Sequence, residues 1–163
     1  MQRTLIMNLR KKENSLKYFS FYLVQYKEVN MFVSKVNNVI KEINSIFYNN
    51  FSEKKKILEL FCGEGSVFTH ELSRDAKFCL GCDINSKFKE RFESTVPNGI
   101  FYCADTIKEL QKEKIPQYFN GEDYNIISVD NPLCIYGENY CEHFEVIDHI
   151  NYLISHKKML CFY

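Results

Sequence analysis

The sequence has few of the features that mark membrane, secreted or extracellular proteins. No apolar stretch approaches the ~20 residues that a membrane-spanning helix needs. Asn8, Arg10 and Lys11 interrupt the first candidate for the apolar segment of a signal peptide. The seven cysteines are odd in number and lack the spacing of a disulfide framework. These absences predict a cytoplasmic protein that keeps its thiols reduced and contacts no membrane.

Internal repeats, low-complexity linkers and net charge are absent as well. A chain of 163 residues, 45% of them hydrophobic, supports one domain with a real core and a terminal arm. Residues 1–56 contain 11 Lys or Arg against 4 Asp or Glu, whereas residues 57–163 contain 10 against 17. Such a basic arm predicts contact with DNA, RNA or an acidic partner, and a solvated helix face explains the same pattern.

The order of the expected elements indicates an α/β fold. In the basic N-terminal arm, residues 1–53, apolar residues recur every three or four positions and predict an amphipathic helix over 31–48. Segment 17–26 fits a strand or a helical turn. Further on, strands are expected over 56–61, 78–82, 100–103, 125–130 and 158–163, and helices over 66–74, 86–94, 106–114 and 142–155. This alternation predicts a doubly wound, mostly parallel sheet over residues 54–163.

The most informative stretch is ILELFCGEGS, residues 57–66. Its apolar beginning suits a strand that is buried on both faces. Gly63 and Gly65 then allow backbone angles and a close ligand approach that side chains would block. The helix expected next would turn its N-terminal N–H groups toward a bound ligand. A strand, a glycine turn and a helix in this order predict a site for an adenine-containing cofactor.

Polar residues follow the ends of three later strands, where open α/β sheets bind ligands. They are Asp83 in GCDIN, Asp105 in YCADT, and the group 130–132 in SVDNPL. The carboxylate of Asp83 can accept both hydroxyls of a ribose, and Asp105 can accept a hydrogen bond from an adenine amino group. An acid after a strand also fits a helix N-cap, and Asp105 fits that alternative especially well.

In order and spacing, ELFCGEG, CDIN, CADT and VDNPL resemble the motifs of the class I S-adenosylmethionine-dependent methyltransferases, over residues 54–163. The resemblance implies a Rossmann-like methyltransferase fold with S-adenosylmethionine as its cofactor. A nicotinamide-dependent dehydrogenase is the nearest alternative, but its fingerprint requires a third glycine where this chain has Phe68. The cofactor-binding residues that the resemblance implies are Glu59, Phe61, Gly63, Gly65, Asp83, Ile84 and Asp105.

The resemblance also implies a role for most of these residues. Glu59 and the two glycines would bed the methionine part of the cofactor. Asp83 would hold the ribose, Ile84 would pack on the adenine, and Asp105 would bind the adenine amino group.

The group after the fourth expected strand bears on the methyl acceptor. By the resemblance, Asp130, Asn131 and Pro132 are catalytic and orient the acceptor, which is expected to be an amino group of a nucleic-acid base. In enzymes that methylate such amino groups, the motif continues with a second proline and an aromatic residue that stacks on the flipped base. This chain has Leu133-Cys134 there instead, so its match to that motif is partial.

Residues near this group offer further alternatives. Tyr136 is a second candidate for base stacking, and a Cys134 thiolate would attack a pyrimidine carbon if the enzyme methylated carbon. Glu142 and His143 are candidates for a base or for substrate orientation, and a helix start rich in acids explains them as well.

A zinc site is not expected. Cys79 and Cys82 have zinc-like spacing, but on one strand they would point to opposite faces, and no second closely spaced pair is present.

The last seven residues, KKMLCFY, predict a buried strand at which the sequence stops. An exposed strand edge is normally protected. We therefore expect a sheet that lacks its last strands, or an edge that the N-terminal arm or a second chain covers in a homo- or hetero-oligomer. The alternative to an active enzyme is a truncated or non-catalytic subunit that binds the cofactor and pairs with a partner chain.

Overall fold

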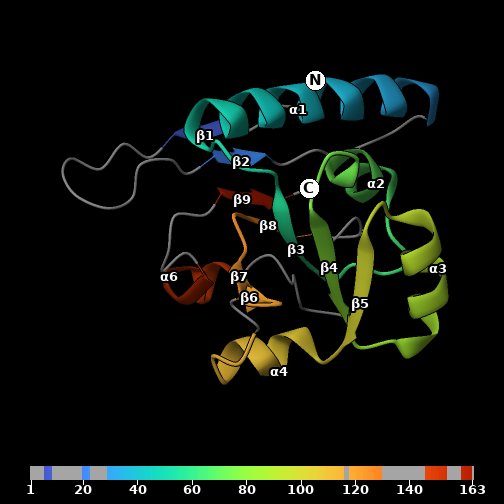
Figure 1. Cartoon of the computed structure of the whole chain (residues 1–163), viewed down its shortest axis with the longest axis vertical. Coiled ribbons are helices and arrows are strands. Elements are labelled where there is room, and N and C mark those ends of the chain that lie inside the picture. Colours follow the sequence, from blue (N-terminus) through green and yellow to red (C-terminus); the bar gives the residue numbers. More distant parts are fainter. Residues whose placement is uncertain are drawn as a thin grey trace.

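The computed structural model describes residues 6–8, 20–22, 29–115, 118–129, 146–153 and 159–162 (Figure 1). Its strands are β1 (Ile6–Asn8), β2 (Ser20–Tyr22), β3 (Lys56–Leu60), β4 (Phe78–Asp83), β5 (Gly99–Cys103), β6 (Tyr118–Phe119), β7 (Glu122–Asp123), β8 (Ile126–Val129) and β9 (Met159–Phe162). Its helices are α1 (Val29–Asn50), α2 (Val67–Ser73), the short 3₁₀ helix η1 (Ser86–Phe88), α3 (Lys89–Thr95), α4 (Thr106–Gln111) and α6 (Ile150–Leu153).

Five strands form one parallel sheet in the order β5-β4-β3-β8-β9. From β3 the chain runs outward through β4 to β5, and it then returns to place β8 on the other side of β3. The order therefore reverses between β3 and β8, which is where open α/β sheets bind ligands. These strands confirm the predicted α/β fold with a parallel sheet.

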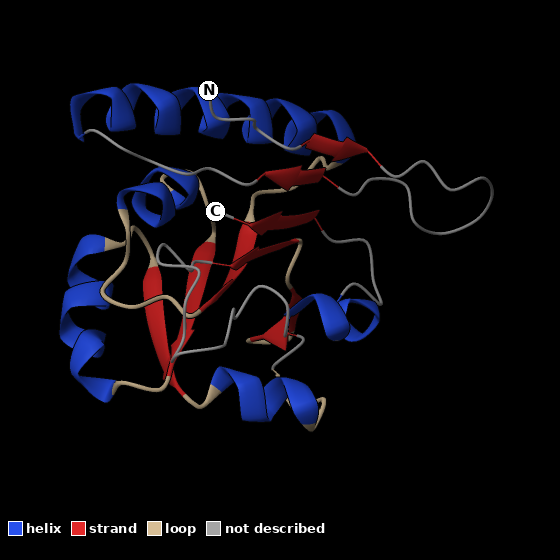
Figure 2. Ribbon diagram, turned by 180° about the vertical axis from the view of Figure 1, so that it is seen from behind, coloured by secondary structure: helices blue, strands red, loops and turns tan. Residues whose placement is uncertain are grey.

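Alternate residues of each strand enter two separate cores, because side chains on a strand point to opposite faces. Ile57 and Cys79 pack on the side covered by α1, α2 and α3, whereas Leu58 and Leu80 pack on the side of α4 and α6. Figure 2 shows helices on both sides of the sheet. A sheet covered on both faces explains why its strands are continuous apolar runs rather than alternating ones.

Helix α1 is part of the first core. Val36, Ile40, Ile43 and Phe47 recur at helical spacing and are buried there. The helix runs from Val29 to Asn50 and so contains the predicted range 31–48.

A buried cation beside β3 ties α1 to α2. Nζ of Lys55 donates to Asn44 Oδ1 at 2.9 Å and to the carbonyl of Leu72 at 2.6 Å, and it forms an ion pair with Asp75. Burial lowers the pKa of Lys55, although Asp75 acts against that shift. Hydrogen bonds to the protein thus replace the water that this ammonium group loses.

Two short hairpins were not predicted. Strands β6 and β7 are antiparallel, and Asn120 and Gly121 between them both have positive φ, of 51° and 78°. This Asn-Gly pair is typical of a two-residue hairpin turn and was a signal in the sequence. Strands β1 and β2 form the other hairpin, so segment 17–26 contains a strand rather than a helical turn.

The N-terminal hairpin lies at the end of the large sheet. Strand β2 contacts β9, the edge strand that was expected to need a cover (Figure 1). Among the described helices, none combines the length and the apolar character that crossing a bilayer would require.

Candidate functional site

The candidate site lies where three neighbouring strands end. The backbone N–H of Cys62 donates to the carbonyl of Cys82 at 3.1 Å, and that of Ala104 donates to the carbonyl of Asp83 at 2.9 Å. These bonds continue the pairing of the three strands just past the ends of β3 and β5. The glycine turn after β3, Asp83 at the end of β4 and Asp105 after β5 therefore lie at neighbouring strand ends.

The glycine turn has a backbone that only a few residues adopt easily. Phe61, Gly63 and Gly65 all have positive φ, of 59°, 52° and 84°. A Cβ at Gly65 would lie 2.5 Å from Cγ2 of Val96 in the segment after α3, so this glycine is required for packing. A Cβ at Gly63 would meet no atom of the described residues within 4 Å. Gly63 thus faces open space, which a ligand could occupy.

Asp83 links the glycine turn to the loop after β4. Its Oδ2 accepts the backbone N–H of Gly63 at 3.0 Å, and its Oδ1 accepts the backbone N–H of Asn85 at 2.8 Å. Each carboxylate oxygen offers about two acceptor positions, so both oxygens keep acceptor capacity for a ligand. The carboxylate is half-buried, at the boundary between the sheet and solvent.

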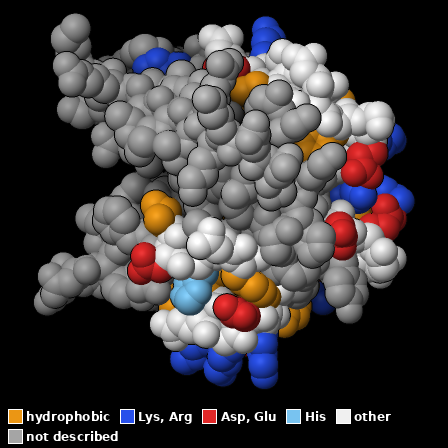
Figure 3. Space-filling view, turned by 90° about the vertical axis from the view of Figure 1, so that its left-hand side faces the viewer, with side chains coloured by type: hydrophobic (Ala, Val, Ile, Leu, Met, Phe, Trp, Pro, Cys, Tyr) orange, Lys and Arg blue, Asp and Glu red, His pale blue; other side chains and the backbone are white. Residues whose placement is uncertain are grey.

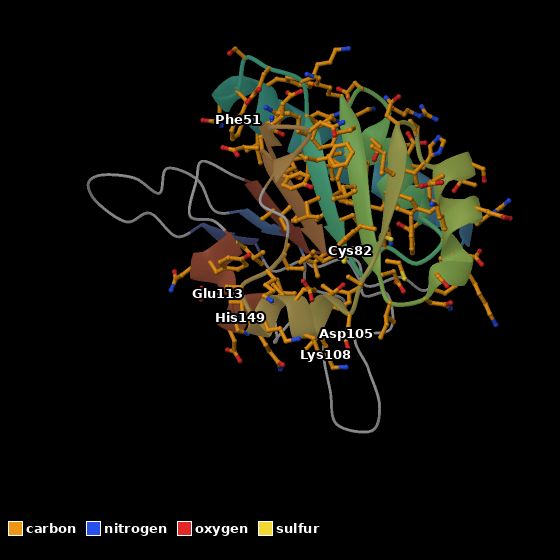
Figure 4. The ribbon with its side chains drawn as sticks, turned by 60° about the horizontal axis from the view of Figure 1, so that its bottom comes forward. Phe51, Cys82, Asp105, Lys108, Glu113 and His149 are labelled. Atoms are coloured by element: carbon orange, nitrogen blue, oxygen red, sulfur yellow. The ribbon has the colours of Figure 1, made fainter. Side chains whose placement is uncertain are left out.

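Ile84 and Asp105, the next two predicted residues, differ in their contacts: Ile84 is exposed, whereas Asp105 caps a helix. The side chain of Ile84, directly after β4, is 57% exposed and therefore accessible to a ligand. Asp105 is the N-cap of α4: its Oδ1 accepts the N–H of Lys108 at 3.1 Å and its Oδ2 pairs with Lys108 Nζ at 3.0 Å. These hydrogen bonds hold the pKa of Asp105 below its usual value. Figure 4 shows Asp105 and Lys108 at the same edge as Cys82.

Glu59 does not reach the open space of the turn. Its side chain is fully buried on the face covered by α1 and α2, and its Oε1 accepts the hydroxyl of Thr69 at 2.6 Å. Thr69 and the N-cap residue Ser66 form a capping box at the start of α2. Neither Thr69 nor Ser66 was predicted as a site residue. A serine followed three residues later by threonine resembles the usual capping box, which ends in Glu or Gln.

The described core cysteines lie on both faces of the sheet, and their thiols have raised pKa values. Cys79 and Cys82 belong to opposite cores, as predicted, and no group of three potential ligands is found among the described residues. Burial raises the pKa of Cys82 to about 11 and that of Cys161 to about 12, and it raises that of Cys79 as well. These thiols therefore stay protonated at neutral pH.

Several predicted positions lie outside the described residues. They are the catalytic group of Asp130, Asn131 and Pro132, the alternatives Cys134 and Tyr136, and the pair of Glu142 and His143.

A protein-family model matches most of the chain. The model describes the D12 class of N6 adenine-specific DNA methyltransferases, and it matches residues 34–162. No curated protein matches the sequence at a significant level.

Solved structures similar to this one include three methyltransferases. A TehB-like S-adenosylmethionine-dependent methyltransferase from Corynebacterium glutamicum is 14% identical, with 77% of this chain and 70% of that chain covered and a TM-score of 0.44. Magnesium protoporphyrin IX methyltransferase from Synechocystis, solved with bound SAH, is 16% identical, with 76% and 50% covered and a TM-score of 0.47. An amino pentose methyltransferase from Micromonospora echinaspora is 9% identical, with 82% and 53% covered and a TM-score of 0.48.

Proposed function

Because the chain belongs to the D12 class N6 adenine-specific DNA methyltransferase family, we propose that it transfers a methyl group from S-adenosylmethionine to the amino group of adenine in DNA. Family membership confirms the predicted methyltransferase class, and it supports S-adenosylmethionine as the cofactor and a base amino group of DNA as the acceptor. The chain spans about half the length of two of the solved methyltransferases it resembles, so the activity of the whole protein is part of this proposal.

The cofactor would lie over the ends of β3, β4 and β5. The open space beside Gly63 would receive its methionine part, with Gly65 and Phe61 shaping the turn. Asp83 would accept the ribose hydroxyls, and the exposed side chain of Ile84 would pack on the adenine. Asp105 would offer its remaining acceptor capacity to the adenine amino group while it caps α4.

Glu59 would act on the cofactor indirectly. Because it is fully buried, it would support the turn from below rather than contact the ligand.

The bond between Asp83 and Gly63 is the observation that most supports this cofactor site. It joins the two loops that the family resemblance assigns to different parts of one cofactor. The open space and the ribose acceptor are therefore adjacent, as a single bound molecule requires.

The methyl acceptor would be held by the group after β8. S-adenosylmethionine, when bound, supplies an activated methyl group, so the protein mainly positions the two reactants and excludes water. Asp130, Asn131 and Pro132 would orient the adenine amino group for in-line attack and accept its hydrogen bonds. Leu133-Cys134 replaces the second proline and the aromatic residue, which favours a non-catalytic, cofactor-binding subunit as the second candidate.

DNA has two candidate basic surfaces. The predicted one is the N-terminal arm, but α1 lies at the opposite end of the sheet from α4, as the labels for Phe51 and Lys108 in Figure 4 show. Lys108, Lys112 and Lys114 are exposed on and just after α4, and Figure 3 shows basic side chains at that end of the molecule. We propose that these lysines contact DNA phosphates near the site and that the arm contacts DNA farther away.

Two further expectations remain predictions. One is an oligomer that covers the edge of the sheet, and the other is a cytoplasmic location.

Calorimetry with S-adenosylmethionine tests the cofactor site directly. We expect micromolar binding by the wild type and at least a tenfold loss for Asp83→Ala, which removes both acceptor oxygens. Asp83→Asn keeps one oxygen and should lose less. Asp123→Ala is the matched control, because Asp123 is an exposed aspartate in β7, outside the site. A folded wild type that does not bind would refute the cofactor site.

Transfer of a labelled methyl group to adenine-containing DNA tests the activity. We expect N6-methyladenine in DNA and no label in RNA. Binding of the cofactor without transfer to DNA would instead support the non-catalytic subunit.

A further inference from the structure

Ser66, Thr69 and Glu59 form a hydrogen-bond network beneath the glycine turn, and the proposed reaction assigns no role to Thr69. Thr69 is fully buried on α2, and its hydroxyl donates to Glu59 Oε1 at 2.6 Å. Thr69 Oγ1 also accepts the backbone N–H of Ser66 at 3.2 Å and lies 2.9 Å from the Ser66 hydroxyl oxygen. Ser66 Oγ in turn accepts the backbone N–H of Thr69 at 3.1 Å.

The number of protons fixes the direction of these bonds. A threonine hydroxyl has one proton, and Thr69 gives it to Glu59. In the contact between the two hydroxyls, Ser66 must therefore be the donor and Thr69 the acceptor. The bonds run in one order, from Ser66 to Thr69 to the carboxyl group of Glu59.

The network joins the two ends of the turn. Glu59 lies in β3, two residues before Phe61, the first residue of the turn with positive φ. Ser66 directly follows Gly65, the last such residue. A helix cap needs only the bonds between Ser66 and Thr69, whereas the bond to Glu59 crosses from helix to strand. Thr69 therefore fixes where the turn begins relative to where it ends.

We propose that Thr69 is a positioning residue for cofactor binding. By holding Glu59 and Ser66 together, it keeps Gly63 in the geometry in which its open side and its bond to Asp83 face one ligand. Thr69 donates to a carboxyl group in a buried site, where a hydrogen bond is stronger than in water. This inference rests on the proposed S-adenosylmethionine site and adds a residue that acts through the turn rather than by contact.

The test compares two substitutions at Thr69. Thr69→Val keeps the shape and loses the hydroxyl, and we expect about a tenfold rise in the Kd for S-adenosylmethionine, as expected for the loss of a buried hydrogen bond. Thr69→Ser restores the hydroxyl and should bind within about threefold of the wild type. Ser73→Ala is the matched control, because Ser73 is a buried hydroxyl on the same helix that contacts Cys79 instead.

Amide hydrogen exchange supplies a second measurement that needs no cofactor. In Thr69→Val, exchange should become faster in residues 61–66, with little change in β4 and β5. Should Thr69→Val fail to fold, the same exchange comparison is made with Ser66→Ala, which removes the donor to Thr69.

The two proposals fail in different ways. A wild type without cofactor binding would refute the cofactor site, and exchange in the turn would still decide the role of Thr69. Unchanged exchange in residues 61–66 and unchanged affinity in a folded Thr69→Val variant would overturn the inference. Equal losses in Thr69→Val and Thr69→Ser would overturn it as well, because the hydroxyl would then not be the cause.

Discussion

Replacing Gly63 by alanine should separate cofactor binding from folding. Among the described residues, no atom lies within 4 Å of the methyl group that alanine would add at Gly63, so the cost to folding that the structure shows is the positive φ of 52°. A left-handed conformation costs an L-residue about 1–2 kcal/mol. For a protein of this size, 1 kcal/mol lowers Tm by about 2–4 °C, so we expect a decrease of about 2–8 °C.

The same methyl group should have a large effect on the ligand. It would project into the space that the proposed cofactor occupies, and we expect S-adenosylmethionine affinity to fall at least tenfold. Gly65→Ala is the matched comparison in the same turn. There the methyl group would lie 2.5 Å from Val96 in addition to the strain at φ 84°, so folding stability should fall by more than for Gly63→Ala.

Thermal unfolding measures the folding stability of the two variants, and calorimetry measures their affinity for S-adenosylmethionine. Wild-type affinity in Gly63→Ala would show that the cofactor does not lie beside Gly63. A loss of stability in Gly63→Ala equal to that in Gly65→Ala would refute the reasoning from the open space.

Two further predictions concern stability. Lys55→Met removes the buried ammonium group that bonds to α1 and α2, and urea unfolding should show a loss of about 2–3 kcal/mol; unchanged stability would contradict a role for this group in joining the two helices. Hydrogen bonds from Lys56 and Lys108 lower the pKa of Glu53 and Asp105, respectively. The stability that these hydrogen bonds contribute is therefore present above the ordinary pKa values of 4.5 for Glu53 and 3.8 for Asp105. It should be lost as the pH falls through the lowered pKa values of the two groups. A Tm that stayed constant from pH 6 to 2 would contradict this expectation.

The sequence predicted the parallel sheet well because its signal is strong. Each central strand is an apolar run followed by a polar or glycine residue, and the four strand ends occur in a fixed order. The two hairpins were not predicted, for different physical reasons. Strands β1 and β2 have three residues each, which is too short for a pattern to emerge. Strands β6 and β7 are shorter still, but Asn120-Gly121 marked their turn.

The order of the motifs predicted which residues lie near the candidate site, but not which way their side chains point. Asp83 and Ile84 lie where the sequence placed them, with a carboxylate at the turn and an exposed apolar side chain. Glu59 belongs to the same motif, yet the alternation of β3 turns it into the core with Ile57 rather than toward the ligand. Thr69 could not be predicted because its bond to Glu59 depends on how α2 packs against the sheet.

The contact between β2 and β9 has a consequence for how the molecule folds. These strands lie near opposite ends of the chain, so one of the contacts that complete the sheet edge is also among the most distant in sequence. Contacts of this range form slowly, because a long loop must close before they stabilise anything. During synthesis β3, β4 and β5 emerge well before β9, so the glycine turn can take its shape while β8 still lacks its outer neighbour. We therefore expect the ligand-facing half of the sheet to form first and the contact between β2 and β9 to form last.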